Sequence, residues 1–320
     1  MEHPAVPSSN ANSAPVAPEL ASHGYTITRP VARSAIPADY TFVLTRDEIY
    51  VPIALRKPPG KGPFPVIVMG RGAGRGGLPH VEQQVERLSG MQDCMIERGY
   101  AVAYVNYRNE VPHLYGRTER SRNLPDDMSG GENRTLKSSP TLDSDDLIAI
   151  LQYLKTLPYG NGRIGVMGVS HGGEMILKVA AETGFGAGVV IEGASHEFLG
   201  VDTGPRAPRK DNELQYQDIE VVRAHANKEE AMTRIRRIDT PLLHLGRDSD
   251  HLQGIFQLAH EWLREAGKDS TWKSFHHPDH GYPLIYRQPD GSYRPDPVQA
   301  EAFDLVMDYF DVRLKTTRDS

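Results

Sequence analysis

Short apolar segments alternate with amphipathic ones along most of this chain, and no other feature constrains its fold as strongly. The apolar segments, such as residues 65–69 and 187–191, are typical of strands buried on both faces of a parallel sheet. The segments between them, such as residues 171–183 and 255–266, have the apolar periodicity of helices. Strands that alternate with helices in this way predict an α/β protein with a mostly parallel, doubly wound sheet.

The same patterns locate the individual elements and the limits of the domain. Strands are predicted at residues 40–43, 49–55, 65–69, 101–106, 163–169, 187–191, 241–245 and 272–275, and helices at 80–98, 145–157, 171–183, 229–237, 255–266 and 298–314. A short charged turn joins the first two strands, which indicates an antiparallel hairpin at the start of the sheet. Residues 1–37 are rich in Pro, Ala, Ser and Asn, which predicts a disordered or loosely packed lead before a single domain at 38–320. Polar insertions at about 109–142 and 200–239 are long enough to act as lids over a pocket.

The composition argues against several classes of protein. A net charge of −6 without a basic stripe argues against a nucleic-acid partner. No apolar run approaches the roughly 18 residues that span a bilayer, and the N-terminus lacks the basic start and apolar core of a secretory signal. Cys94 is the only cysteine, which rules out an internal disulfide and fits a reducing compartment. We therefore expect a cytoplasmic protein that acts on a small molecule, with no membrane partner and an oligomeric state that the sequence does not indicate.

Residues 168–172 read Gly-Val-Ser-His-Gly and match the pattern G-x-S-x-G around Ser170. The pattern alone is weak, but here it lies between the predicted strand 163–169 and the predicted helix 171–183. A sharp strand-to-helix turn lifts a serine hydroxyl to the carboxyl edge of the sheet and points the helix dipole toward it. Ser195 also follows a strand, but its surroundings, Gly-Ala-Ser-His-Glu, lack the second glycine. We therefore predict that Ser170 is a nucleophile and that Ser195 is not.

A serine hydroxyl needs a base that takes its proton and a carboxylate that orients this base. His280 follows the last predicted strand and precedes a glycine, so we prefer it to His276 and His277 at the strand end. Two carboxylates, Asp248 and Asp250, follow the predicted strand before that one. The spacing to the apolar positions of the next helix favours Asp248 as the acid, and Asp250 is the alternative.

These residues give the chain a resemblance to the α/β-hydrolase superfamily, and within it to the catalytic domain of prolyl oligopeptidases and to dienelactone hydrolase-like enzymes. The resemblance covers roughly residues 38–315 and is carried by residues 63–66 (Pro-Phe-Pro-Val), 163–173 and 280–282 (His-Gly-Tyr). It implies the α/β-hydrolase fold, with a mostly parallel sheet behind an antiparallel N-terminal hairpin. It also implies a triad of Ser170, Asp248 and His280, with serine where classical dienelactone hydrolases have cysteine.

In the α/β-hydrolase fold, two backbone N–H groups bind the oxyanion. One belongs to the residue after the nucleophile, here His171, and the other to the loop after the third strand, here Gly72 or Ala73. Arg71 in the same loop is a candidate contact for an acidic or polar acyl group. Oligopeptidases often carry a tyrosine donor where this chain has Arg71, Gly72 and Ala73, so we expect a serine hydrolase that cleaves a carboxylic ester. A small peptidase or amidase is the alternative.

Other interpretations of the polar residues have less support. Residues 276–280 (His-His-Pro-Asp-His) offer metal ligands, but the proline breaks the helix that a zinc hydrolase motif needs. The glycines of residues 72–77 have the G-x-G-x-x-G spacing, but no acidic residue ends the following strand as a dinucleotide site requires. We therefore expect no metal and no other cofactor, and a non-catalytic or dinucleotide-binding module is the distant alternative. Asp143, Asp145 and Asp146 are expected to cap the helix at 145–157.

Overall fold

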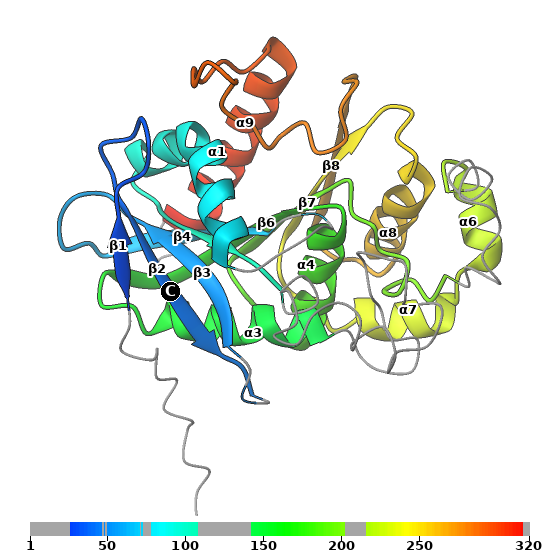
Figure 1. Cartoon of the computed structure of the whole chain (residues 1–320). Coiled ribbons are helices and arrows are strands. Elements are labelled where there is room, and N and C mark those ends of the chain that lie inside the picture. Colours follow the sequence, from blue (N-terminus) through cyan, green and yellow to red (C-terminus); the bar gives the residue numbers. More distant parts are fainter. Residues whose placement is uncertain are drawn as a thin grey trace, which may run out of the picture.

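A twisted sheet of nine strands runs through the molecule, and helices cover both of its faces (Figure 1). This computed structural model describes residues 26–46, 48, 50–70, 72, 78–107, 142–201 and 216–315. The strands are β1 (Ile27–Arg29), β2 (Ala38–Leu44), β3 (Tyr50–Arg56), β4 (Phe64–Gly70), β5 (Ala101–Val105), β6 (Gly160–Val169), β7 (Ala187–Ile191), β8 (Leu242–Arg247) and β9 (Ser270–Phe275). The helices are α1 (Leu78–Glu97), α3 (Leu142–Lys155), α4 (His171–Glu182), α6 (Ile219–His225), α7 (Lys228–Ile235), α8 (Gln253–Glu265) and α9 (Pro297–Phe310), which continues into the π-helical turn η3 (Asp311–Lys315).

The sheet has an antiparallel start and a parallel remainder. Its strand order is β1-β2-β3-β5-β4-β6-β7-β8-β9, and β1, β2, β3 and β5 pair antiparallel in succession. From β5 to β9 every neighbouring pair is parallel. The structure therefore confirms the mostly parallel sheet with an N-terminal hairpin, which is the α/β-hydrolase fold.

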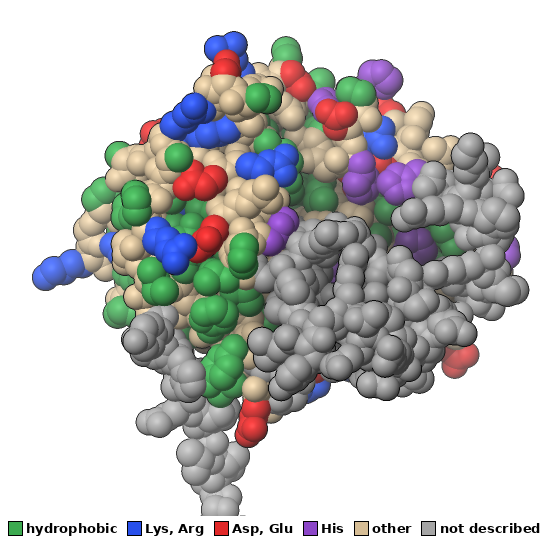
Figure 2. Space-filling view, viewed as in Figure 1, with side chains coloured by type: hydrophobic (Ala, Val, Ile, Leu, Met, Phe, Trp, Pro, Cys, Tyr) green, Lys and Arg blue, Asp and Glu red, His purple; other side chains and the backbone are tan. Residues whose placement is uncertain are grey.

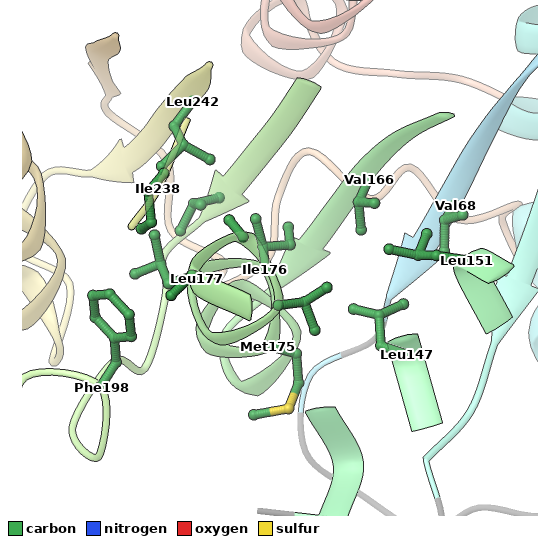
Figure 3. Packing of buried hydrophobic residues seen from close by; sticks show 14 of the residues in the cluster. Val68, Leu147, Leu151, Val166, Met175, Ile176, Leu177, Phe198, Ile238 and Leu242 are labelled. Carbon is green, nitrogen blue, oxygen red and sulfur yellow. The ribbon is translucent and has the colours of Figure 1, made fainter. Parts of the chain in front are cut away.

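Two separate apolar cores hold the helices on the two faces. One core joins the sheet to α3, α4, α6, α7 and α8, and the other joins it to α1 and α9. In Figure 3, Leu147 and Leu151 of α3 lie close to Val68 and Val166 of the central strands. Both faces of the central strands are therefore buried, which explains why these strands are apolar almost throughout.

Residues 26–37, the described part of the predicted lead 1–37, pack against the domain, and residues 1–25 lie outside the described residues, so for them the prediction stays a prediction. Strand β1 pairs with β2, and Val31 is buried. Four polar residues then tie this segment to α1 and to the segment before α9, and we call them the N-terminal cluster. Its members are Ser34, Arg56, Asp93 and Arg287. The buried and charged contacts of this cluster hold residues 26–37 against the domain. The composition of the segment does not reveal these contacts.

Two other predictions are affected by the extent of the described residues. The insertion at 109–142 lies almost wholly outside them, as do residues 202–215 of the second insertion, so their role as lids stays a prediction. The described part of the second insertion contains the predicted helix, α7, and in addition α6, which sequence periodicity did not predict. Within the described ranges, no helix combines the length and the apolar character needed to cross a bilayer.

Candidate active site

The parallel strands end at one edge of the sheet, and the predicted site residues follow them there. Ser170 comes directly after β6, Asp248 and Asp250 after β8, and His280 after β9. In open α/β sheets, ligands bind at the carboxyl ends of the strands, because loops from several strands converge there. Figure 2 shows histidine side chains (purple) gathered on the face viewed in Figure 1, near the ends of β7 and β8.

Ser170 lies in a strained turn between β6 and α4. Its φ of 53° and ψ of −114° are unusual for a residue with a side chain. Hydrogen bonds hold this conformation: Ser170 N donates to Ile191 O at 2.9 Å, and Ser170 O accepts from Gly173 N at 2.9 Å. Strain maintained by the surrounding structure is characteristic of functional positions, and this is the geometry of a nucleophile elbow.

Glycines flank the serine because the chain has no room for side chains there. A Cβ on Gly168 would lie 2.7 Å from the backbone of Gly172, and one on Gly173 would lie 2.8 Å from Gly193 Cα. Contacts this short do not occur for real Cβ atoms, so these positions of the motif are fixed by backbone crossing. The elbow predicted from the G-x-S-x-G pattern therefore has the close packing that the pattern requires.

The loop that carries His280 lies beside the elbow. A Cβ on Gly281, whose φ is +80°, would lie 3.4 Å from Val169 Cγ2, so the backbone after His280 passes against the residue before Ser170. Tyr282 anchors the loop, since its hydroxyl donates to Gly246 O at 3.2 Å. The His280 side chain is 27% exposed. The structure thus places the loop of the predicted base against the residue that precedes the predicted nucleophile.

The carboxylate that contacts His280 is Asp250, so the preference for Asp248 requires correction. Asp250 Oδ2 lies 2.9 Å from His280 Nδ1, and the Asp250 side chain is fully buried. Asp248 is more exposed, and its Oδ1 accepts a hydrogen bond from Ser274 Oγ at 2.5 Å. The turn after β8 explains the difference, because Ser249 has a φ of +62°, which changes the direction of the chain between the two aspartates. The preference for Asp248 rested on the spacing to the apolar positions of the next helix, and this spacing contains no information about the turn.

A second carboxylate, Glu192, also reaches His280, and sequence reasoning missed it. Glu192 directly follows β7, its side chain is fully buried, and its Oε2 lies 3.1 Å from His280 Nδ1. Arg247 contacts both acids, with Nη2 2.7 Å from Asp250 Oδ2 and Nε 3.5 Å from Glu192 Oε1. We call Glu192, Arg247, Asp250 and His280 the histidine cluster. One sequence feature could have identified Glu192: it is an acidic residue directly after a wholly apolar strand.

Burial and charge shift the pKa values within the histidine cluster in different directions. Burial raises the pKa of Glu192 to about 7, against the opposing effects of His280 and of the Gly281 N–H. Burial would also raise the pKa of Asp250, but hydrogen bonds from His280 and from Leu252 N lower it to about 2. For His280, burial favours the neutral imidazole, yet the hydrogen bond to Asp250 and the charge of Glu192 raise its pKa. The cluster therefore stabilises a positive charge on the imidazole.

The predicted oxyanion-binding residues are partly described. A Cβ on Gly72 would lie 3.5 Å from Ser170 Cβ, so this glycine packs directly against the predicted nucleophile. His171 begins α4, and its Nε2 lies 2.8 Å from Asp143 Oδ2. Asp143 lies in the first turn of α3, at the helix start where it was expected, and its carboxylate also contacts this imidazole. Arg71 and Ala73 lie outside the described residues, so their roles stay predictions.

The other histidines considered from the sequence lie elsewhere. His277 is buried, with Nε2 2.9 Å from Asp296 Oδ2 at the start of α9, and His276 is exposed. The described residues contain one group that could offer three metal ligands, formed by Asp250, His251 and His280. Asp250 and His280 already hydrogen-bond each other there, and Arg247 contacts the same carboxylate oxygen, which opposes a cation. The arrangement fits proton transfer better than metal binding.

Solved structures with this fold include both peptidases and esterases. An acylaminoacyl peptidase from Pyrococcus horikoshii matches 90% of this chain with a TM-score of 0.57 and 19% identity, over 43% of its own chain. Dipeptidyl peptidase 4 from Porphyromonas gingivalis matches 87% with a TM-score of 0.57 and 18% identity, over 36% of its own chain. The esterase rPPE matches 88% with a TM-score of 0.57 and 15% identity, over 85% of its own chain. At these identities the matches show the fold, and the chain spans less than half the length of either peptidase.

Sequence comparison gives a more specific result. Residues 57–312 match the model of the dienelactone hydrolase family, which covers all strands from β4 to β9 and the helices that follow them. A comparison with curated protein sequences gave no match. The matched range contains the elbow, the histidine cluster and Gly72.

Proposed function

Since this chain belongs to the dienelactone hydrolase family, we propose that it is a serine hydrolase that cleaves a carboxylic ester through an acyl-enzyme on Ser170. The observation that carries the proposal is the strained Ser170 turn, against which the loop of the Asp250-bound His280 packs. A strained serine at a strand-to-helix turn, a histidine and a buried carboxylate are the parts that this chemistry needs.

Each residue has a definite task in the proposed reaction. The Nδ1–H of His280 donates to Asp250, which leaves Nε2 as the atom that takes the proton from Ser170 Oγ. The serine oxygen then attacks the ester carbonyl, and the imidazolium returns the proton to the leaving alcohol. Water attacks the acyl-enzyme in the second half, again with His280 as base, and the acid product leaves. The backbone N–H groups of Gly72 and His171 are the proposed oxyanion donors, with Ala73 as the alternative to Gly72.

The test is a pair of serine variants assayed with p-nitrophenyl acetate and butyrate. Ser170→Ala is expected to lower kcat by at least about 10⁴-fold, because no other group can form the acyl-enzyme. Ser195→Ala is the matched control, since Ser195 also follows a strand and is buried, yet lies in no elbow. A fluorophosphonate probe should label the wild type and Ser195→Ala but not Ser170→Ala. Full activity or labelling of Ser170→Ala would refute the proposal.

A peptidase or amidase is the second candidate function. The matched parts of the acylaminoacyl peptidase and of dipeptidyl peptidase 4 have the same fold as this chain. An acyl-enzyme forms from an ester or from an amide by the same steps, but an amide needs stronger protonation of its leaving nitrogen. The discriminating measurement compares an aminoacyl or peptidyl p-nitroanilide with the matching p-nitrophenyl ester. An anilide cleaved at a comparable kcat/KM would establish peptidase activity, and cleavage of the ester alone would establish an esterase.

A further inference from the structure

Glu192 is a buried acid beside the His280 imidazole. A triad of nucleophile, base and one orienting acid does not require this second carboxylate. Its Oε2 lies 3.1 Å from His280 Nδ1, only slightly farther than the 2.9 Å of Asp250 Oδ2. Both side chains are fully buried, so neither reaches solvent in place of the histidine. Two carboxylates from the ends of adjacent strands, β7 and β8, therefore converge on one N–H group.

The position of Glu192 is tightly determined. Its φ is 46°, a conformation rare for residues with a side chain, and its backbone N–H donates to Leu245 O at 2.8 Å. Its Oε2 accepts a short hydrogen bond from Gly281 N, the residue after the histidine. Its Oε1 makes no hydrogen bond within the described ranges and lies 3.5 Å from Arg247 Nε. Glu192 thus holds both the imidazole and the loop that carries it.

Charge gives the second carboxylate a physical consequence. When both acids are ionised, they outweigh the single guanidinium of Arg247 until His280 becomes an imidazolium, which makes the cluster neutral. Among the described residues, Tyr282, whose pKa is raised by burial and by Glu192, also faces the cluster, as does His251, whose ring centroid lies 5.0 Å from that of His280. Glu192 and Asp250 are the carboxylates that contact the imidazole in the described part of the chain, and the charge of Glu192 is one cause of the raised pKa of His280.

We propose that Glu192 is a second positioning carboxylate for His280, which shares the Nδ1–H bond with Asp250 and can orient the imidazole when Asp250 is lost. This inference rests on the function proposed above for Ser170 and His280. The inference extends the proposed function, because it assigns the orientation of His280 to two carboxylates, Asp250 and Glu192, that accept from the same Nδ1–H group.

The variants that test it are Glu192→Gln, Asp250→Asn and the double variant. Glutamine keeps an oxygen that can accept the Gly281 N–H, so it removes the charge while preserving the loop anchor. Asp93→Asn is the matched control, because Asp93 also pairs with a buried arginine but lies in the N-terminal cluster, away from His280. Thermal unfolding of each variant identifies any that fails to fold.

The first measurement is kcat/KM for p-nitrophenyl butyrate as a function of pH. We expect a loss of about tenfold for Glu192→Gln, about 10²-fold for Asp250→Asn, and about 10⁴-fold for the double variant, the loss typical of a histidine with no orienting acid. The loss in the double variant thus exceeds the product of the single losses. The acid limb of the profile should also move to lower pH in Glu192→Gln, because removing a negative charge lowers the pKa of the imidazole. Asp93→Asn should change neither quantity.

The second measurement is the NMR titration of the His280 imidazole, identified by its loss in His280→Asn. Its pKa should fall by about one unit in Glu192→Gln and further in the double variant. An unchanged titration, or a loss from Glu192→Gln that is equal in both backgrounds, would overturn the proposal. The titration needs no turnover, so it stands apart from the proposed function. If Ser170→Ala stays active, the proposed hydrolase function is refuted. If Ser170→Ala is inactive but the His280 titration is unchanged in Glu192→Gln, only the proposed role of Glu192 is refuted.

Discussion

The molecule contains two clusters in which an arginine is buried beside a carboxylate. One is the histidine cluster at the carboxyl edge of the sheet, and the other is the N-terminal cluster. Arg56 is 1% exposed and lies 2.6 Å from Asp93, and Arg247 is 14% exposed and lies 2.7 Å from Asp250. Ser34 and Arg287 complete the N-terminal cluster with a hydroxyl and a second guanidinium. The histidine cluster adds an imidazole and a second acid, and its loop packs against the residue before Ser170. The same kind of ion pair thus holds a segment in one place and accompanies the proposed proton transfer in the other.

The largest effect on stability should come from the N-terminal cluster. Arg56→Met leaves Asp93 without its nearest cation and removes the hydrogen bonds that the guanidinium donates to the carbonyls of Ile36 and Ser89. Breaking a buried pair costs about 3–5 kcal/mol, and we expect about 3 kcal/mol here, because Asp93 is partly exposed and retains Arg287. Urea unfolding measures the loss, and kcat/KM of the folded variant should stay within about twofold of wild type.

A surface pair provides the control for that variant. Arg98→Met removes the partner of Asp308, which is 70% exposed, and one of the partners of Asp311, which retains Lys315. It should cost no more than about 1 kcal/mol. If Arg56→Met costs as little as Arg98→Met, the N-terminal cluster does not attach the segment. If it lowers kcat/KM substantially, the two clusters are not separate in function.

The two aspartates after β8 should differ by a factor that kinetics can resolve. Asp250→Asn is expected to lower kcat/KM by about 10²-fold, less than the loss of the only acid, because Glu192 still accepts from the imidazole. Asp248→Asn removes a carboxylate that contacts Ser274 and not His280, so its effect should stay under about threefold. Steady-state kinetics of both variants measures the ratio. A larger loss from Asp248→Asn would reinstate the residue that the sequence favoured.

Sequence reasoning about this chain succeeds for the strands and for the residues placed by them. The apolar strands of the parallel sheet were located from their patterns, because burial on both faces demands such residues. The positions of Ser170 and His280 followed, since Ser170 lies directly after a recognisable strand and His280 lies in the loop after another. The hairpin β2–β3 was equally visible from its alternating strands and charged turn.

The remaining parts of the site depend on interactions that leave no local pattern. The choice between Asp248 and Asp250 rests on the positive φ of Ser249, and nothing in the identity of that residue requires it. The contact of Glu192 with His280 joins residues 88 positions apart, across three strands of the sheet. The attachment of the N-terminal segment likewise needs partners from α1 and from the segment before α9.

The clusters should differ in how they couple stability to pH. The pKa of Glu192 is raised by burial from 4.5 to about 7, so its contribution to stability is complete below pH 4.5 and is lost as the pH rises through 7. Asp250 behaves oppositely, since its pKa of about 2 makes its contribution fall only as the pH drops below 3.8. Glu192→Gln should therefore flatten the decline in unfolding free energy between pH 4.5 and 7, by on the order of 2 kcal/mol.

Urea unfolding across this pH range tests the coupling. Asp93→Asn is again the control, and it should shift the whole curve downward while keeping the slope of the wild type. A wild-type curve that is flat between pH 4.5 and 7, or that rises, would show that Glu192 stays ionised throughout and would contradict this prediction.

The smallest expected effect concerns the residue that joins the N-terminal segment to its cluster. Ser34 Oγ donates to Asp93 Oδ1 at 2.8 Å, and Arg56 Nη2 donates to the same hydroxyl oxygen. Ser34→Ala removes these hydrogen bonds and the one that Ser34 Oγ accepts from Ile36 N, but it leaves the ion pair of Arg56 and Asp93 intact. The loss should therefore be about 1 kcal/mol, well below that of Arg56→Met. Limited proteolysis of the segment should accelerate severalfold, because the rate follows the population of the detached segment. The value of kcat/KM should stay unchanged, because the histidine cluster keeps every contact. If the variant is as stable as wild type and equally resistant to protease, the hydroxyl contributes nothing to attachment, and burial of Val31 together with the β1–β2 pairing is sufficient to hold this part of the chain.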